Sequence, residues 1–425
     1  MAAIDSGSGL PGDVRPDGGA PRRSAPPAAG ALLLGGILAV AFNMRAAITS
    51  LPPVFPELAG AGFSTVVESA LAAVPVLSFA VFSGIAPGLA RRLGEERVLG
   101  LALLMLATGL LLRSAAPGVL LFPGTIIASC AIALMNVLLP SLVKRRRPDS
   151  AGLVIGLYLL SMTAGAVLGS VIAVPVFAVA GGQDTAVRLT LGMWALPALL
   201  AVLIWLPQIR FRTVPGPGGG RRSVLGMGRH LLAWQLTAFM GLQSLTYYTT
   251  LSWFPTMFRD HGIGAAAAGN LIALLNLGNA VTGLVVPMLA QRVRDQRLLA
   301  VAAVLAIIIG LAGSGFGPNA LAALFVTMLG LGQGAAFALS IYFVTARAAD
   351  AHAAAALSGF AQAGGYLLAS TGPLLIGLLH SATGGWTVPL VILLGCAFGE
   401  LVTGVLSGRA RTIGTAEPAP AAASA

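Results

Sequence analysis

Charged residues are scarce in this chain of 425 residues. Asp, Glu, Lys and Arg make up only 9% of it, whereas 57% of its residues are hydrophobic. A soluble protein of this composition would need an apolar core far too large for a chain of this length. The shortage of charge therefore excludes an ordinary soluble domain.

The residue types that build most catalytic and metal sites are also few. The chain has two Cys and four His, and neither type is spaced as zinc ligands are. No paired carboxylates and no nucleophile–base pair stand out. The glycine-rich segment 215–220 lacks the Lys-Ser/Thr that completes a phosphate-binding loop. We therefore expect no enzymatic activity, no metal and no cofactor.

Long apolar stretches, by contrast, fill most of the chain. Twelve occur, near residues 31–54, 67–90, 98–114, 119–143, 151–180, 189–207, 231–257, 267–290, 298–315, 320–346, 353–379 and 386–407. A helix of roughly 20 apolar residues crosses about 30 Å of hydrocarbon. Only helices and closed barrels satisfy all backbone hydrogen bonds in lipid. Unbroken apolar runs lack the alternation of apolar and polar residues that is typical of barrel strands. The sequence predicts an all-α protein with 12 transmembrane helices in the cell membrane.

Basic residues lie almost entirely on alternate connections between these stretches. With the N-terminus inside the cell, all but four of the 25 Lys and Arg residues fall on the cytoplasmic side. The exceptions are Arg45 within the first stretch and Arg113, Arg188 and Arg259 outside. The positive-inside rule then predicts that both termini are cytoplasmic. The net charge of +11 reflects this topology and contact with anionic lipid, so we expect the bilayer, and no nucleic acid, as a partner.

The longest cytoplasmic connection divides the stretches into six and six. We expect a flexible linker at 208–230, six-helix bundles at 31–207 and 231–407, and disordered cytoplasmic tails at 1–30 and 408–425. Segments 85–104 and 285–304 share seven identical residues at an offset of 200, and each joins the second stretch of a half to the third. Parallel repeats of this kind occur in transporters whose two domains rock around a site near the bilayer midplane.

Five blocks of sequence carry a family resemblance. They lie at 43–50, 136–140, 156–158, 241–248 and 357–369. In these blocks the chain resembles the cyanate-permease and nitroimidazole-exporter family of the major facilitator superfamily. The resemblance implies two six-helix bundles around a central cavity, and transport of a small solute by alternating access. It does not name the solute.

The connection between the second and third stretches departs from the pattern usual in that superfamily, Gly-x-x-x-Asp-Arg-x-Gly-Arg-Arg. Arg91 stands where the Asp belongs, and Glu95 and Glu96 stand where the basic pair belongs. Either glutamate is a candidate to replace the gating contact assigned to that Asp. The alternative is a solvated, charged turn.

Arg45 is the most informative single residue. It lies about seven residues before Pro52, hence roughly 10 Å of helix from the outer end of the first stretch. A guanidinium within a span is costly and normally faces the bundle interior or a water-filled cavity. Its planar fork suits a carboxylate or another small anion. We expect Arg45 to bind an anionic substrate; the alternatives are a snorkelling side chain, and a structural pair with a backbone carbonyl or with Glu57.

Polar and aromatic side chains recur at helical spacing in other stretches. Gln243 and Tyr247, with Tyr248 beside them, lie in the seventh stretch, and Gln362 and Tyr366 lie in the eleventh. Residues four apart share a helix face. In lipid such groups turn inward, where they line a path or bond to neighbouring helices. We expect both pairs to line the cavity. Further candidates are Asn43, Asn136, Tyr158 and Gln333, and the pair Asn276 and Asn279 in the eighth stretch.

Acidic residues inside the stretches bear on proton coupling, which needs a carboxyl group whose protonation changes during transport. Glu68, near the outer mouth of the second stretch, is the candidate proton relay, and Glu400 in the twelfth is expected to be structural. The sequence favours a monomeric secondary active transporter of a small, cyanate-like anion, with coupling to protons left open. The alternatives are a proton-coupled exporter of small aromatic or cationic toxicants, and a membrane receptor that transports nothing.

Overall fold

Helices make up nearly all of this computed structural model, which describes residues 27–60, 62–147, 150–214, 221–349 and 351–413. The long helices are α1 (Pro27–Thr49), α3 (Thr65–Leu93), α4 (Glu95–Ala115), α5 (Pro117–Arg146), α6 (Ala151–Val179), α10 (Leu231–Asp260), α11 (Ala265–Ala290), α12 (Arg297–Phe316), α13 (Ala322–Ala346), α14 (Ala351–Thr383) and α15 (Thr387–Ser407). The shorter ones are η1 (Pro52–Val54), α2 (Phe55–Gly60), α7 (Gln183–Gly192), α8 (Ala195–Trp205), η3 (Leu206–Gln208), α9 (Arg221–Gly226), η4 (Met227–Arg229) and η5 (Asn319–Leu321).

Each of the twelve expected stretches forms a helix or a series of helices. Eleven helical segments of the described chain are long and apolar enough to cross a membrane. The remaining stretch, 231–257, forms α10, which has 30 residues but many polar ones. Because α10 packs against α11, α13, α14 and α15, protein rather than lipid surrounds its polar side chains. The expected all-α membrane architecture is confirmed.

Two of the expected helices are interrupted. α1 ends at Thr49, and the chain continues as η1 and α2. Pro52 begins η1; it has no N–H with which to continue the hydrogen-bond ladder of α1. The sixth stretch divides into α7 and α8 at Met193 and Trp194. The apolar runs therefore located these spans but not their breaks.

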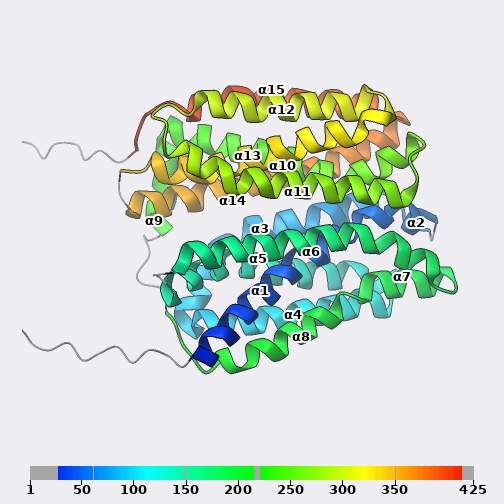
Figure 1. Cartoon of the computed structure of the whole chain (residues 1–425), viewed down its shortest axis with the longest axis horizontal. Helices are drawn as coiled ribbons and strands as arrows, with labels where there is room; N and C mark the ends of the chain where they lie inside the picture. The colour runs from blue at the N-terminus through cyan, green and yellow to red at the C-terminus, as the bar shows by residue number, and fades with distance from the viewer. Residues whose placement is uncertain (1–26, 61, 148–149, 215–220, 350, 414–425) are drawn as a thin grey trace, which may run out of the picture.

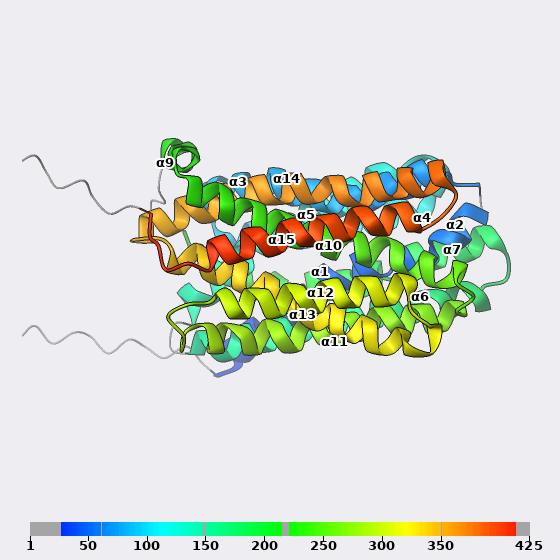
Figure 2. The same ribbon diagram turned by 90° about the horizontal axis from the view of Figure 1, so that it is seen from above.

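The helices form two groups that correspond to the two halves of the sequence. In Figure 1, α1–α8 lie below and α10–α15 above, with the long helices running along the longest axis, as Figure 2 also shows. Helix starts repeat at the offset of 200 residues: α3 begins at Thr65 and α11 at Ala265, while α6 begins at Ala151 and α14 at Ala351. The halves meet mainly where α3 packs on α14 and α6 on α11.

Both ends of the described chain lie at the same end of the molecule, together with α9 (Figure 1). We call this the basic end, because the basic segments 91–97 and 144–147 lie there. We call the opposite end, which carries α2, the outer end, after the topology that the sequence predicts. The expected linker 208–230 contains α9, which packs on α14. Its segment 215–220 lies outside the described residues, as do residues 1–26 and 414–425 of the expected tails.

Glu95 and Glu96 are buried at the basic end rather than exposed on a charged turn, so the alternative of a solvated turn is wrong. The Glu95 carboxylate accepts a hydrogen bond from Ser141 at 2.7 Å and pairs with Arg145 at 3.4 Å. The Glu96 carboxylate accepts a hydrogen bond from the Thr213 backbone N–H at 2.7 Å. These partners all belong to the N-terminal half and the segment that follows it. The two glutamates therefore hold that half together.

The halves are tightly joined at the outer end. Glu57 of α2 pairs with Arg259 of α10 at 2.6 Å. A Cβ placed on Gly269 of α11 would lie 2.8 Å from the backbone oxygen of Ser170 on α6, and one on Gly377 of α14 would collide with Ser69 of α3. Toward the basic end, three glycines on the same helices have open space beside them. A Cβ on Gly84 of α3, Gly156 of α6 or Gly283 of α11 would meet no neighbouring atom within 4 Å.

Candidate substrate-binding site

The site is built around Arg45, four residues before the end of α1. The side chain is half-buried, and its Nη1 is buried with no hydrogen-bond partner among the described residues. The guanidinium lies over the ring of Tyr247 at 5.7 Å from the ring centroid and within hydrogen-bonding reach of the Tyr248 hydroxyl. Of the alternatives for Arg45, a structural pair with Glu57 is wrong, because Glu57 pairs with Arg259.

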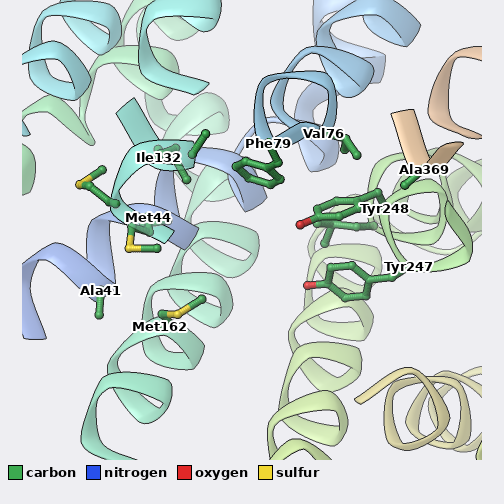
Figure 3. Packing of buried hydrophobic residues seen from close by; sticks show 14 of the residues in the cluster. Ala41, Met44, Val76, Phe79, Ile132, Met162, Tyr247, Tyr248 and Ala369 are labelled. Carbon is green, nitrogen blue, oxygen red and sulfur yellow. The ribbon is translucent and has the colours of Figure 1, made fainter. Parts of the chain in front are cut away.

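Four of the five tyrosines of the chain surround Arg45. Tyr158 comes from α6, Tyr247 and Tyr248 from α10, and Tyr366 from α14; all four lie within electrostatic range of the guanidinium. Figure 3 shows the phenol rings of Tyr247 and Tyr248 directed from α10 toward the N-terminal half, where Met44 and Met162 lie. Arg45 and its tyrosines therefore form a single cluster, supplied by both halves, which we call the Arg45 cluster.

Neighbouring side chains fix three of the four tyrosine rings, those of Tyr247, Tyr248 and Tyr366. Phe79 of α3 packs against Tyr248 and Tyr366, with ring centroids 6.1 and 5.6 Å apart. The Tyr247 hydroxyl donates a hydrogen bond to Asn276 Oδ1 at 3.1 Å, and Asn276 Nδ2 donates to the Ile272 carbonyl. Aromatic packing and this hydrogen-bond chain leave the rings little rotational freedom. The cluster is thus preorganised.

The charge of Arg45 has no acidic counterpart. Within the described part of the chain, no ion pair includes Arg45, and the acidic groups nearest in sequence, Glu57 and Glu68, lie at the outer end. The same part of the chain contains no group of three His, Cys, Asp or Glu side chains that could hold a metal ion. An uncompensated guanidinium surrounded by four tyrosine side chains can donate hydrogen bonds to a small anion, and the rings can contact a planar solute.

Other expected site residues lie on the helices that supply the cluster. Gln243, one turn before Tyr247 on α10, is buried, and its Oε1 accepts a hydrogen bond from Ser244. Gln362, one turn before Tyr366 on α14, is half-buried and donates to the Ser358 hydroxyl. Asn136 is half-buried on α5. Gln243 and Gln362 therefore lie on helices of the cluster, but both side chains already take part in local hydrogen bonds.

Asn43 faces away from the cluster. Its Nδ2 donates to the Ala39 carbonyl at 2.9 Å and to the Pro197 carbonyl at 3.1 Å, so it ties α1 to α8. Glu68 is buried in the first turn of α3, next to the outer contact that Ser69 makes near Gly377. Its Oε1 has no hydrogen-bond partner among the described residues. The structure thus brings neither residue into the Arg45 cluster.

Of the further polar candidates, Asn276 joins the cluster because it accepts a hydrogen bond from the Tyr247 hydroxyl. Gln333 instead donates a hydrogen bond to the Thr250 hydroxyl of α10 at 3.3 Å. Asn279 lies beside Gly334 of α13, where its backbone contacts that glycine. Glu400 of α15 is fully buried, with Thr246 of α10 at 3.4 Å. Of these four residues, only Asn276 contributes directly to the geometry around Arg45.

Arg113 is a buried cation that the sequence analysis missed. The sequence predicts that Arg113 lies on an outer connection, because it stands one residue before the end of the third apolar stretch. In the structure its side chain is 2% exposed and turns inward from α4. A charged residue at the edge of an apolar run can face either way, so position alone gave no signal of its burial.

Comparisons with known proteins agree with this architecture. The sequence model of the Major Facilitator Superfamily matches residues 33–373. The chain is 39% identical to the 2-nitroimidazole transporter of Escherichia coli over 384 residues, which cover 90% of this chain and 96% of that protein. It is 28% identical to the cyanate transport protein CynX of Escherichia coli, covering 86% and 94% of the two chains. It is also 40% identical to the uncharacterized transporter YycB of Bacillus subtilis, covering 90% and 94%.

Solved structures share the fold at low sequence identity. The D-xylose–proton symporter superposes with a TM-score of 0.68 at 15% identity, covering 89% of this chain and 95% of that one. The nucleoside transporter NupG superposes with a TM-score of 0.71 at 13% identity, covering 88% and 99%.

Proposed function

Because this chain belongs to the Major Facilitator Superfamily, we propose that it is a secondary active transporter that moves a small organic or inorganic anion, similar to cyanate, across the cytoplasmic membrane. The observation that carries the proposal is the Arg45 guanidinium, which has a buried, unpartnered Nη1 and no ion pair among the described residues. A cation that has lost hydration and has no counter-ion favours an anion beside it.

Both halves of the molecule supply residues to the site, and this makes transport possible. Arg45 and Tyr158 belong to the N-terminal half, and Tyr247, Tyr248 and Tyr366 belong to the C-terminal half. An anion that accepts hydrogen bonds from the Arg45 guanidinium and from phenol hydroxyls is held by both halves at once. Binding then favours states in which both sets of donors converge, and the halves rock about the site in alternating access.

The contacts between the halves support one state of that cycle. The outer end is closed by the Glu57–Arg259 ion pair and by close packing at Gly269 and Gly377. Solute then exchanges at the basic end, which the positive-inside rule places in the cytoplasm. Rupture of the Glu57–Arg259 pair accompanies the change to the opposite state.

Two relatives are named for small solutes, 2-nitroimidazole and cyanate, and this supports a small solute for this chain as well. The alternative function is a proton-coupled exporter of small aromatic or cationic toxicants. Four tyrosine rings favour planar solutes, and Glu68, buried with an unpartnered Oε1, is a candidate proton relay. The charge of Arg45 disfavours cations at the same place, because like charges repel strongly in a medium of low dielectric.

The test is uptake of labelled cyanate and of 2-nitroimidazole into proteoliposomes, with and without an inward proton gradient. Arg45→Gln replaces the guanidinium with a neutral, planar amide on a shorter side chain. We expect anion uptake to fall by at least about tenfold, as for the loss of one charge-assisted hydrogen bond. Arg188→Gln is the matched control, because Arg188 lies exposed on α7 in an ion pair with Asp184.

Undiminished cyanate uptake by a folded Arg45→Gln protein would contradict the anion proposal. Loss of 2-nitroimidazole export in Glu68→Gln, together with retained export in Arg45→Gln, would establish the alternative function instead.

A further inference from the structure

A small cavity lies between the halves, on the outer side of Arg45. Its volume is ≈ 30 Å³, enough for a water molecule or a small anion. The lining includes Leu51 and Pro52, which follow Arg45 toward the outer end, and Tyr248 from the opposite half. Because Tyr248 also lies within hydrogen-bonding reach of Arg45, the cavity is the next compartment along the same path.

Arg113 places a full positive charge at this cavity. Its side chain is 2% exposed, and its Nε donates to the Leu191 carbonyl at 3.2 Å, while Nη1 and Nη2 approach the Ala47 carbonyl at 3.4 and 3.5 Å. No ion pair includes Arg113 in the described chain. Carbonyl groups near the ends of α1 and α7 therefore offset the charge only partially.

Hydrogen-bond donors remain available there. A guanidinium has five N–H groups, and the carbonyl contacts of Arg113 account for three. Thr125 of α5, which also lines the cavity, is 3% exposed, and its hydroxyl has no hydrogen-bond partner among the described residues. Ser129 lies one turn further along the same face of α5 and lines the cavity as well. An unpartnered hydroxyl beside a buried cation is costly unless something fills the space between them.

We propose that this cavity is a second anion site, which holds one small monovalent anion between Arg113, Thr125 and Ser129. The proposal rests on the proposed anion transport, because the site lies next to the Arg45 cluster on the solute path. A purely structural Arg113, which only tethers α1 and α7 to α4, would explain the carbonyl contacts. It would not explain the cavity or the unpartnered Thr125 hydroxyl. The occupied second site lowers the cost of separating an anion from Arg45 toward the outer end.

The test uses radiolabelled thiocyanate, a small linear monovalent anion, in equilibrium dialysis against the full chain in lipid nanodiscs. The Arg45→Gln background removes the central site, so any remaining saturable binding reports the second one. We expect Arg45→Gln to retain such binding. Addition of Thr125→Val should weaken it about tenfold, the effect of one hydrogen bond to a charged group. Thr125→Val leaves the carbonyl contacts of Arg113 intact, so a merely structural role predicts no change.

Thr190→Val is the matched control, since the Thr190 hydroxyl on α7 is also buried and unpartnered among the described residues but does not line the cavity. Unchanged binding in this control, with weakened binding in Thr125→Val, supports the site. Absence of binding in Arg45→Gln, or equal binding in Thr125→Val, overturns it. Cyanate uptake tests the proposed function separately, because uptake can be lost in Arg45→Gln whether or not the second site exists.

Discussion

At the residue scale, Tyr248 tests whether phenol hydroxyls take part in binding at the Arg45 cluster. Tyr248→Phe keeps the ring packed on Phe79 and removes only the hydroxyl within reach of the guanidinium. We expect the KM for cyanate uptake to rise about tenfold, because one donor to a charged solute is lost. Tyr342→Phe is the control, since Tyr342 on α13 is the fifth tyrosine and lies outside the cluster. Equal KM values in the two variants would remove the hydroxyl from the site.

The residues of the site differ in how far they could be predicted from the sequence. Arg45 was predictable, because a charge inside an apolar run is rare and costly and must have a polar environment. Tyr247 and Tyr366 were predictable from their spacing to Gln243 and Gln362, whereas Tyr158 had no such partner and was only a further candidate. Thr125 was not predictable, because a threonine is common in membrane helices, and only the three-dimensional structure leaves its hydroxyl without a partner. Asn43 was given a binding role that its hydrogen bond to Pro197 does not favour.

At the scale of elements, glycine determines how closely α6 approaches α1. A Cβ on Gly169 would lie 2.9 Å from the Ala46 carbonyl oxygen, whereas one on Gly156, on the same helix, would meet nothing within 4 Å. Gly169→Val should therefore destabilise the protein by about 1–3 kcal/mol through overpacking, and Gly156→Val should have little effect. Thermal unfolding in detergent checks this. Similar losses in both variants would show that helix propensity, not the α1–α6 contact, sets the cost.

Helix positions were largely predictable, whereas helix interruptions were not. The stretch expected at 67–90 became α3, Thr65–Leu93, because the thickness of the bilayer fixes the length of apolar sequence. The division of the sixth span into α7 and α8 has no comparable signal in hydrophobicity. It accompanies a tertiary contact, the hydrogen bond from Asn43 to the Pro197 carbonyl. The short helix α9 within the expected linker was also missed, since its packing partner, α14, lies far away in the sequence.

At the scale of the whole molecule, the closed outer end depends on a link between the halves. The Glu57–Arg259 pair is 2.6 Å long, and both side chains are mostly buried, with 15% and 25% exposed. It bridges α2 of one half and α10 of the other, so the proposed alternating access requires it to break when the outer end opens. Loss of the pair removes roughly 1 kcal/mol from the closed state, which corresponds to about a fivefold shift in population.

Accessibility of the inter-half cavity from outside measures that population. In a background with Cys130 and Cys396 replaced by Ala, Ser129→Cys places a thiol in the cavity lining. Labelling by a membrane-impermeant reagent, added on the outer side of oriented vesicles, should be slow when Glu57 is intact. It should accelerate about fivefold in Glu57→Gln, because labelling follows the fraction of outward-open molecules.

Two controls separate this gate from a general effect of charge. Asp184→Asn removes a carboxylate from the surface pair with Arg188, which lies within one half, and should leave the labelling rate unchanged. The double exchange Glu57→Arg with Arg259→Glu restores an attraction between the halves and should return labelling to its slow rate. If Glu57→Gln labels no faster than the parent, the helix packing at Gly269 and Gly377 is sufficient to close the outer end, and the ion pair is not part of the gate.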